Sequence, residues 1–170
     1  TIPASVKMLG SYAFSGCSEF ATVNFAENSQ LETIGQRAFS SCISLESIHI
    51  PAGVTSIHSY TFNGCTALAT VTLSPKVTMI EESAFYLCSG LKEIVIPSSV
   101  TEIGAQAFQK SGLMRVTIPA AVEKIGRAAF SDCNNLDEVI MEDTQPPTIE
   151  AVVFGSDAGG LNETESKFVR

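Results

Sequence analysis

The chain has 170 residues, of which 45% are hydrophobic, so it can bury a core as one elongated domain. The net charge is −8, and the excess of acidic side chains falls in residues 132–170, since residues 1–131 hold nine acidic against eight basic side chains. The sequence shows no basic stripe that could neutralise phosphates, which argues against nucleic acid and against an anionic membrane surface as partners.

A unit of about 23 residues recurs along the chain. Each unit has an Ile or Leu five residues before a Phe, and most units have a Val or Leu three residues earlier still. Six clear copies and a degenerate seventh unit occupy residues 1–154, which is the signature of a tandem repeat. The marker phenylalanines are Phe14, Phe39, Phe62, Phe85, Phe108, Phe130 and Phe154.

The first unit begins with "TIPASV", which corresponds to the end of a strand in the later units. We therefore expect the chain to be a segment of a larger protein. The second unit carries a two-residue insertion near residues 27–30.

In the later units, segments such as "LESIHIP" (45–51) and "LKEIVIP" (91–97) end in an apolar alternation that predicts a short strand with one buried face. Proline then ends the strand, because it has no N–H for the ladder.

One unit cannot bury its own apolar face, whereas stacked units can. We expect an α/β-type repeat solenoid that is mostly β, with a parallel sheet of short strands, turns of 3₁₀ type before each Phe, and little or no α-helix. Residues 1–154 form the solenoid in this interpretation. Residues 155–170 form a closing loop and a terminal strand, which the alternation in "SKFV" (166–169) indicates.

The unit "IPAGVTSIHSYTFNGCTALATV" resembles the 23-residue leucine-rich repeat of BspA-type bacterial and protist surface proteins. The resemblance covers roughly residues 1–154 and involves seven columns that agree in spacing and residue type. The departures are Ser111 in place of the expected Cys, and His58 and Glu81 where other units have Gly10, Gly35, Gly104 and Gly126. The resemblance implies an extracellular or cell-surface binding module that is usually one part of a longer chain.

The cysteines all stand three residues after the marker Phe of their unit. No two are closer than 23 residues, which does not fit the paired spacing of zinc ligands. Disulfides between stacked units are geometrically conceivable, but the odd count and Ser111 argue against them. We expect five reduced and inaccessible thiols in a buried column. These are Cys17, Cys42, Cys65, Cys88 and Cys133.

No catalytic constellation is readable in the sequence. His49 and His58 fall on different faces, and acidic pairs such as Glu81–Glu82 should form a solvated surface rather than convergent carboxylates. We therefore expect no enzyme activity, no cofactor and no metal site.

A binding function would then reside on the outward positions of the strands, where side chains recur on a regular grid. The early units offer hydroxyl and amide groups, and the later ones add charge and two exposed aliphatic side chains. The candidate residues form two columns. The first is Thr22, Ser47, Thr70, Glu93, Arg115 and Glu138, and the second is Asn24, His49, Thr72, Val95, Thr117 and Ile140.

Three classes of function remain open. The first is a non-catalytic module of a surface or secreted protein, which binds a matrix or host protein through the strand face as a monomer. The second is a passive spacer or stalk in a larger surface protein. Glycan recognition ranks below both, because the chain has no Trp and its three tyrosines do not fall on the strands. The chain has no apolar run long enough for membrane insertion.

Overall fold

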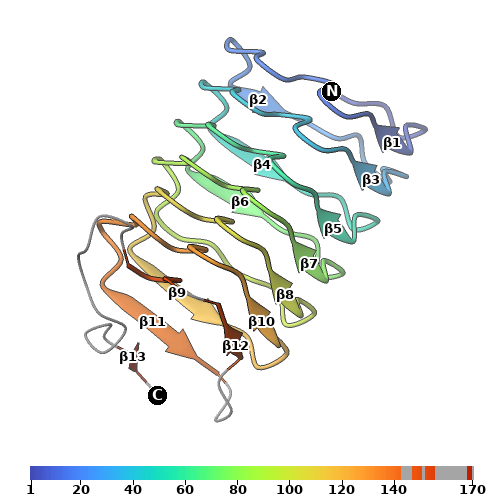
Figure 1. The fold of residues 1–170 in the computed structure, drawn as a ribbon. Coiled ribbons are helices and arrows are strands. Elements are labelled where there is room, and N and C mark those ends of the chain that lie inside the picture. Colours follow the sequence, from blue (N-terminus) through green and yellow to red (C-terminus); the bar gives the residue numbers. More distant parts are fainter. Residues whose placement is uncertain (143–146, 151, 156–167, 170) are drawn as a thin grey trace.

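The computed structural model describes residues 1–142, 147–150, 152–155 and 168–169, and these form a solenoid of stacked coils (Figure 1). No helix is present in these described parts, and an apolar helix of membrane-spanning length is accordingly not found there. The strands are β1 (Met8–Leu9), β2 (Thr22–Val23), β3 (Thr33–Ile34), β4 (Ser47–His49), β5 (Ser56–Ile57), β6 (Thr70–Thr72), β7 (Met79–Ile80), β8 (Glu102–Ile103), β9 (Arg115–Ile118), β10 (Lys124–Ile125), β11 (Glu138–Met141), β12 (Thr148–Ile149) and β13 (Phe168–Val169).

The strands line two faces of the solenoid, and all of them pair in parallel. The face on which we expected binding carries the sheets β2-β4-β6 and β9-β11-β13, and we call it the strand face. The opposite face carries β1-β3 and the five-stranded sheet β5-β7-β8-β10-β12, and we call it the second face. The expected parallel β-solenoid is therefore confirmed.

The strand predicted within residues 91–97 is wrong. This segment lies between β6 and β9 without forming a strand, so the strand face consists of two sheets instead of one (Figure 1). The second face stays continuous at the same level, because β7 pairs with β8. The next coil is one residue shorter. Leu91 follows Phe85 by six residues, whereas Leu113 follows Phe108 by only five. The strand register between these two coils is therefore kept on the second face and lost on the strand face.

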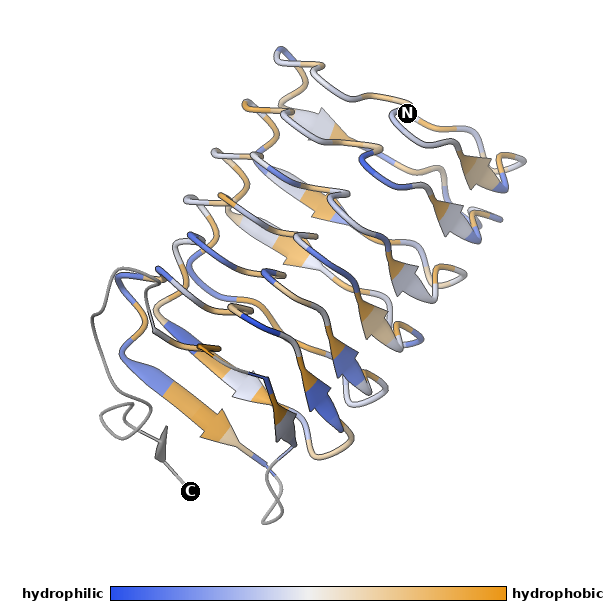
Figure 2. Cartoon of the chain, viewed as in Figure 1, coloured by the Kyte–Doolittle hydropathy of each residue, from blue (hydrophilic) through white to orange (hydrophobic). Residues whose placement is uncertain are grey.

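The core contains a stack of the seven marker phenylalanines. Successive rings lie 5.2–5.6 Å apart between centroids, with interplanar angles of 4–13°. The expected burial of Phe62 between Phe39 and Phe85 is confirmed, since all three side chains are fully buried. Figure 2 shows that hydrophobic and hydrophilic segments alternate along each coil.

In the six turns from Phe14 to Phe130, a residue with positive φ lies on either side of the Phe. In the third coil these are Tyr60 (φ 61°) and Gly64 (φ 73°), which flank Phe62 at a distance of two residues. The intervening N–H groups donate to carbonyls three residues back, as in the expected 3₁₀ turn. The N–H groups of Tyr60, Phe62 and Gly64 instead donate to carbonyls of the next coil. The left-handed residues thus allow alternate amides to link the coils.

The prediction for residues 155–170 falls largely outside the described residues, and the division at residue 154 stays a prediction. Within this stretch the structure describes β13, whose Phe168 and Val169 pair with Val139 and Ile140 of β11. A short strand is therefore present where the alternation indicated one.

The five cysteines are free thiols in one column, as expected. Each buried thiol donates a hydrogen bond of 3.1 Å to the carbonyl of the Phe in the preceding coil, as Cys65 does to Phe39. The expectation of five inaccessible thiols is wrong for Cys17, which is only half-buried because it lies in the first coil. Ser111 takes the same column, with its hydroxyl 3.3 Å from the Cys133 sulfur.

We expect one fast and four slow thiols when the native protein reacts with an excess of a thiol reagent. Cys17 supplies the fast equivalent, because the other four side chains are buried. Denatured protein should give all five equivalents without prior reduction. A count below five after denaturation would reveal a disulfide and contradict the free-thiol column.

Candidate functional site

The strand face places all twelve sequence-predicted residues on the surface, half or fully exposed. The ladders bring some of them together directly. Ser47 lies between Thr22 and Thr70 in the register, and Glu138 lies beside Arg115. In the second column His49 lies beside Thr72, and Thr117 lies beside Ile140. Glu93 and Val95 belong to no strand, so the two columns are interrupted at that coil.

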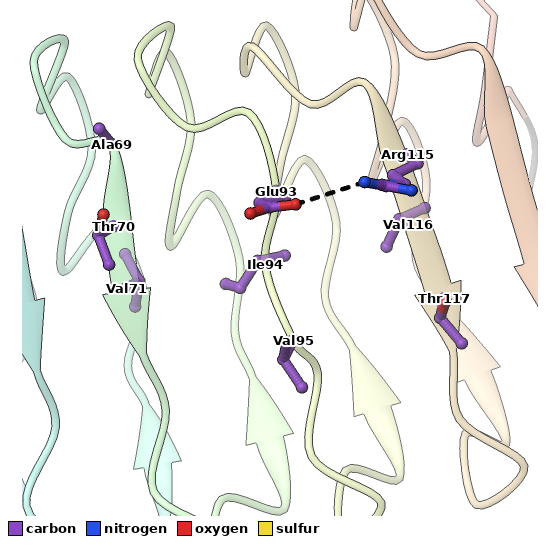
Figure 3. Close-up of a pocket in the computed structure, with 9 residues that line it drawn as sticks. All are labelled: Ala69, Thr70, Val71, Glu93, Ile94, Val95, Arg115, Val116 and Thr117. Carbon is purple, nitrogen blue, oxygen red and sulfur yellow. Dashed lines mark ion pairs between the residues drawn. The ribbon is translucent and has the colours of Figure 1, made fainter.

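The interruption forms a cleft of about 380 Å³ (Figure 3). Ala69–Val71 form one side, Arg115–Thr117 form the other, and Glu93–Val95 run between them. Val95 projects outward with 83% of its surface exposed, the most exposed large hydrophobic side chain of the described residues.

The charged pair at this cleft is only loosely associated. The Arg115 guanidinium lies 3.8 Å from the Glu93 carboxylate, and the two side chains are 68% and 75% exposed. Exposed pairs of this kind contribute little to stability. Both groups are therefore available to a partner.

A second hollow of about 310 Å³ lies near the other end of the strand face. Residues in and directly after β2, β4 and β6 line it, including Asn24, His49 and Thr72. Figure 2 shows that these strands carry mostly intermediate to polar colours apart from their core-facing positions, whereas β11 turns hydrophobic after its first residue. The strand face is thus polar toward the N-terminal end and more apolar toward β11.

The charged side chains within the strands of the second face are paired with one another. Lys124 lies 3.4 Å from the Glu102 carboxylate and 3.2 Å from that of Glu150, so one cation links three successive coils. Arg37 is placed similarly at the Phe turns, with its guanidinium 4.4 Å from the ring centre of Tyr60 and 5.7 Å from that of Tyr12. The sequence signal for this stack is the shared position two residues before the marker Phe.

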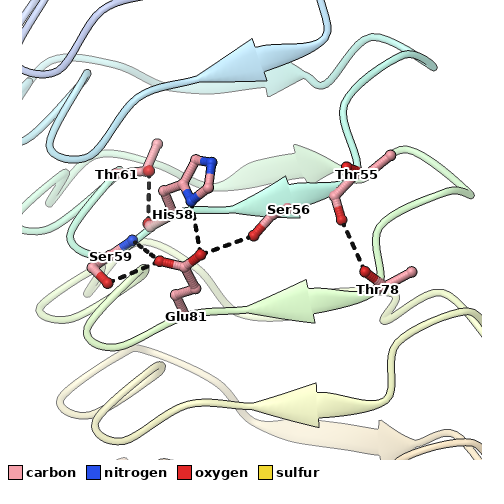
Figure 4. Close-up of polar contacts among 7 residues, drawn as sticks. All are labelled: Thr55, Ser56, His58, Ser59, Thr61, Thr78 and Glu81. Carbon is pink, nitrogen blue, oxygen red and sulfur yellow. Dashed lines mark hydrogen bonds and ion pairs between the residues drawn. The ribbon is translucent and has the colours of Figure 1, made fainter.

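His58 and Glu81 form a cluster that the sequence reasoning missed (Figure 4). The prediction that Glu81 belongs to a solvated acidic surface is wrong, and no partner was predicted for His58. His58 Nδ1 lies 2.7 Å from the Glu81 carboxylate, which also accepts bonds from Ser56 Oγ, Ser59 Oγ and the Ser59 N–H. The available signal was that both residues stand in the glycine column of adjacent coils.

Four other coils have glycine in this column, and at Gly104 and Gly126 the coils approach closely. A Cβ on Gly104 would lie 2.7 Å from the Glu82 backbone nitrogen, and one on Gly126 would lie 2.5 Å from that of Ala105. His58 and Glu81 stand in this column in two adjacent coils, where their side chains contact one another. Glu150 takes the same position in the last unit, where its carboxylate accepts a hydrogen bond from the Arg127 N–H. The cluster therefore joins two coils of the second face.

The cluster contains the His and carboxylate of a catalytic triad, His58 and Glu81, but no serine placed as the nucleophile. A serine nucleophile must contact the imidazole, whereas the hydroxyls of Ser56 and Ser59 both contact the carboxylate. The described residues also contain no group of three His, Cys, Asp or Glu side chains that could hold a metal ion. We assign the cluster to stability.

Glu81→Gln should lower the unfolding free energy by about 1.5–3 kcal/mol at pH 7, because a charged acceptor of several hydrogen bonds is lost. Burial alone raises the pKa of Glu81, but the bonds from His58 and Ser59 outweigh it and leave the pKa below its ordinary 4.5. The stabilisation is therefore complete above pH 4.5 and is lost as the pH falls through the lowered value.

Urea unfolding of the wild type and of Glu81→Gln, from pH 7 to below pH 4.5, measures this difference in unfolding free energy. Their stabilities should converge as the solution becomes more acidic. Glu46→Gln, at an exposed glutamate, is the control and should change stability little. Equal stability of Glu81→Gln and the control at pH 7 would contradict the role of the cluster.

Comparison with known proteins gives a family match over most of the chain. The pattern described as "BspA type Leucine rich repeat region" matches residues 1–114 and 69–158, in six copies. A search of curated proteins found no match.

Several solved structures share the fold. A leucine-rich repeat protein of T. pallidum has a TM-score of 0.75 and 32% identity over 88% of this chain and 67% of its own. A leucine-rich repeat protein of Bacteroides ovatus has a TM-score of 0.64 and 29% identity over 78% of this chain and 33% of its own. A leucine-rich cell surface protein of Faecalibacterium prausnitzii has a TM-score of 0.53 and 28% identity, over 82% and 53%. The chain thus spans from one third to two thirds of the length of these proteins.

Proposed function

Because the chain belongs to the BspA-type leucine-rich repeat family, we propose that it is a non-catalytic module that binds a protein partner through its strand face. Repeat modules of this kind are typically protein-interaction modules and not enzymes. The observation that carries the proposal is the contrast between the two faces. The charges described on the second face are paired, whereas Glu93, Arg115 and Val95 on the strand face remain highly exposed.

The exposed groups fit the composition of a protein interface. Arg supplies several hydrogen-bond donors, and an apolar side chain gains free energy when a partner removes it from water. Thr117 and Glu93 lie beside these two anchors and can orient them. We propose a matrix or host surface protein as the partner, bound by a monomer of this chain.

We further propose a location on the cell surface or outside the cell. The support is the F. prausnitzii relative, which is described as a cell surface protein. The second candidate is a passive spacer, which the stacked arrangement in Figure 1 favours because it places β1 and β11 at opposite ends of the solenoid.

The test is binding of the purified chain to an immobilised panel of extracellular matrix and host surface proteins. A double variant, Val95→Asp with Arg115→Glu, should lose binding to any protein that the wild type captures. Gln36→Glu, at an exposed position near the Phe turn, is the matched control and should retain it. Loss in the control with retention in the double variant would move the site off the strand face. Absence of any captured protein would favour the spacer.

A further inference from the structure

We propose that a hollow beside the strand face binds an aspartate or glutamate side chain of the protein partner. The inference rests on the proposed function and adds a second contact, with its own chemistry, outside the two strand columns. The hollow has a volume of about 550 Å³, and we call it the notch. It is lined by Ser89 of the fourth coil, by residues 110–112 of the fifth, and by Asp132, Asn134 and Asn135 of the sixth.

The notch lies where the chain runs from the Phe turn to the strand face, at the point where the fifth coil is short. The segment between the thiol column and the next Leu holds only Gly112 in this coil, whereas it holds two residues in the fourth and sixth coils. Gly112 is buried against the fourth coil, where a Cβ on it would collide with the Ser89 carbonyl. Ser89, Asn134 and Asn135 stay exposed. The short loop is thus the floor of the notch, and the neighbouring loops are its walls.

The sixth coil presents a free backbone donor at the notch. In the fourth coil the Gly90 N–H donates to the Thr66 carbonyl of the preceding coil at 3.0 Å. The N–H of Asn135, which takes the same position in the sixth coil, makes no backbone hydrogen bond. It lies beside the side-chain amides of Asn134 and Asn135, which are further donors. The wall is therefore suited to a ligand that accepts hydrogen bonds.

Two lysine side chains border the notch without an acidic partner. Lys110 lines it, with its Nζ 5.8 Å from the ring centre of Tyr86. The Nζ of Lys92 donates to the Ser89 carbonyl at 3.4 Å and lies 3.2 Å from the position of a Cβ on Gly112. Neither lysine forms an ion pair with another described residue. Their charges are available to an anion.

The carboxylate of the lining does not cancel these charges. Asp132 Oδ2 accepts a hydrogen bond from Gln109 Nε2 at 3.2 Å, and the Gln109 side chain accepts one from Gln106 at 2.8 Å. This chain of amides holds the Asp132 carboxylate toward the Phe turn. Two ammonium groups against one carboxylate leave a single positive charge, which one incoming carboxylate neutralises through charge-assisted hydrogen bonds.

The lining favours an acidic protein side chain over other anions. Two lysines are too few for a nucleic acid, which needs a basic stripe. Sugars usually stack on aromatic rings, but the lining contains none, and Lys110 covers a face of the neighbouring Tyr86. A partner that already contacts the strand face needs only one Asp or Glu at its edge to reach the notch.

Amide NMR of the full chain, titrated with the blocked peptide acetyl-Gly-Gly-Asp-Gly-Gly-amide, tests the site. Low ionic strength is used because exposed charges are then least screened. The amide signal of Asn135 should shift, since the peptide carboxylate accepts a hydrogen bond from this N–H. The matched peptide with Asn in place of Asp should shift it much less. Equal shifts with both peptides, or no shift with either, would overturn the inference.

Charge-neutral variants test the role of the two lysines. Lys92→Gln combined with Lys110→Gln should weaken binding of the Asp peptide at least about threefold, the scale of exposed charge pairs. Lys76→Gln, at another exposed lysine, is the control and should leave binding unchanged. Unchanged binding in the double variant, or equal weakening by the control, would contradict a specific carboxylate site.

Further outcomes separate the sources of the carboxylate and the two proposals. Methyl glucuronide carries the same group on a sugar, and tighter binding of it than of the Asp peptide would overturn the assignment to a protein side chain. If the notch ignores the Asp peptide while Val95→Asp with Arg115→Glu still abolishes capture on the protein panel, the inference fails and the proposed function stands. If the notch binds the peptide but the panel captures nothing, the result counts against the proposed function alone.

Discussion

Phe62→Ala lowers the unfolding free energy by about 3–5 kcal/mol, the cost expected for truncation of a fully buried aromatic side chain. The ring has a neighbour on each side, at 5.6 Å from Phe39 and 5.3 Å from Phe85. Its removal leaves a void that these rings cannot fill, because cross-coil hydrogen bonds on both sides of residue 62 hold the coils in place. The lost free energy therefore has two parts, the burial of the removed ring atoms away from water and the cavity that they leave.

Urea unfolding monitored by circular dichroism measures this loss. Phe20→Ala is the control, because Phe20 is exposed and its ring contacts that of Phe14, at the end of the stack. The control should cost about 1 kcal/mol or less, the usual value for an exposed aromatic contact. If Phe62→Ala lowered the unfolding free energy no more than Phe20→Ala does, the stabilisation attributed to the ring stack would be contradicted.

The second large effect is alkaline unfolding driven by the buried thiols. Burial, with the thiol of Cys42 as a smaller cause, raises the pKa of Cys65 to about 12, and burial raises that of Cys42 to about 11, from an ordinary 9.0. Burial also raises the pKa of Cys88 and Cys133. Above pH 9.0 the unfolded chain releases protons that the folded chain keeps, so stability falls as the pH rises. Each such thiol contributes about 1.4 kcal/mol per pH unit.

Cys65→Ser isolates one of these contributions. The hydroxyl can still donate to the Phe39 carbonyl, as the thiol does, and Ser111 shows that the column accepts serine. We expect the variant to be about 1 kcal/mol less stable at pH 7, the typical scale for a core substitution, and to match or exceed the wild type at pH 11. Ser111→Cys should steepen the alkaline loss. Parallel stability curves for wild type and both variants, measured under reducing conditions, would contradict this account.

Much of the fold follows from local pattern. The Phe column, the thiol column and the outward strand positions recur at a spacing near 23 residues, and stacking then places equal positions side by side. This is why the burial of Phe62 and the exposure of Val95 could both be predicted from the sequence.

The break in the strand face could not be predicted in this way. "LKEIVIP" (91–97) has the same apolar pattern as "LESIHIP" (45–51), yet only the latter contains a strand. Whether a segment pairs depends on the position of its neighbours, and the following coil is one residue shorter. The cluster of His58 and Glu81 was missed for a related reason, because its contacts join two different coils. In the sequence, these two positions differ from their equivalents only by the loss of glycine.

The alternating hydrogen bonds of the Phe turns also bear on how such a chain can change in length during evolution. Alternate amides of each turn donate to the next coil, and each ring contacts the ring of that coil, so a coil meets equivalent groups whichever interior coil follows it. Duplication or loss of a whole unit therefore preserves the amide and ring contacts between coils, whereas a change of a few residues shifts the two faces relative to one another. In such an array the complete coil is the length change that keeps these contacts, and a change of one residue within a coil alters the local shape instead.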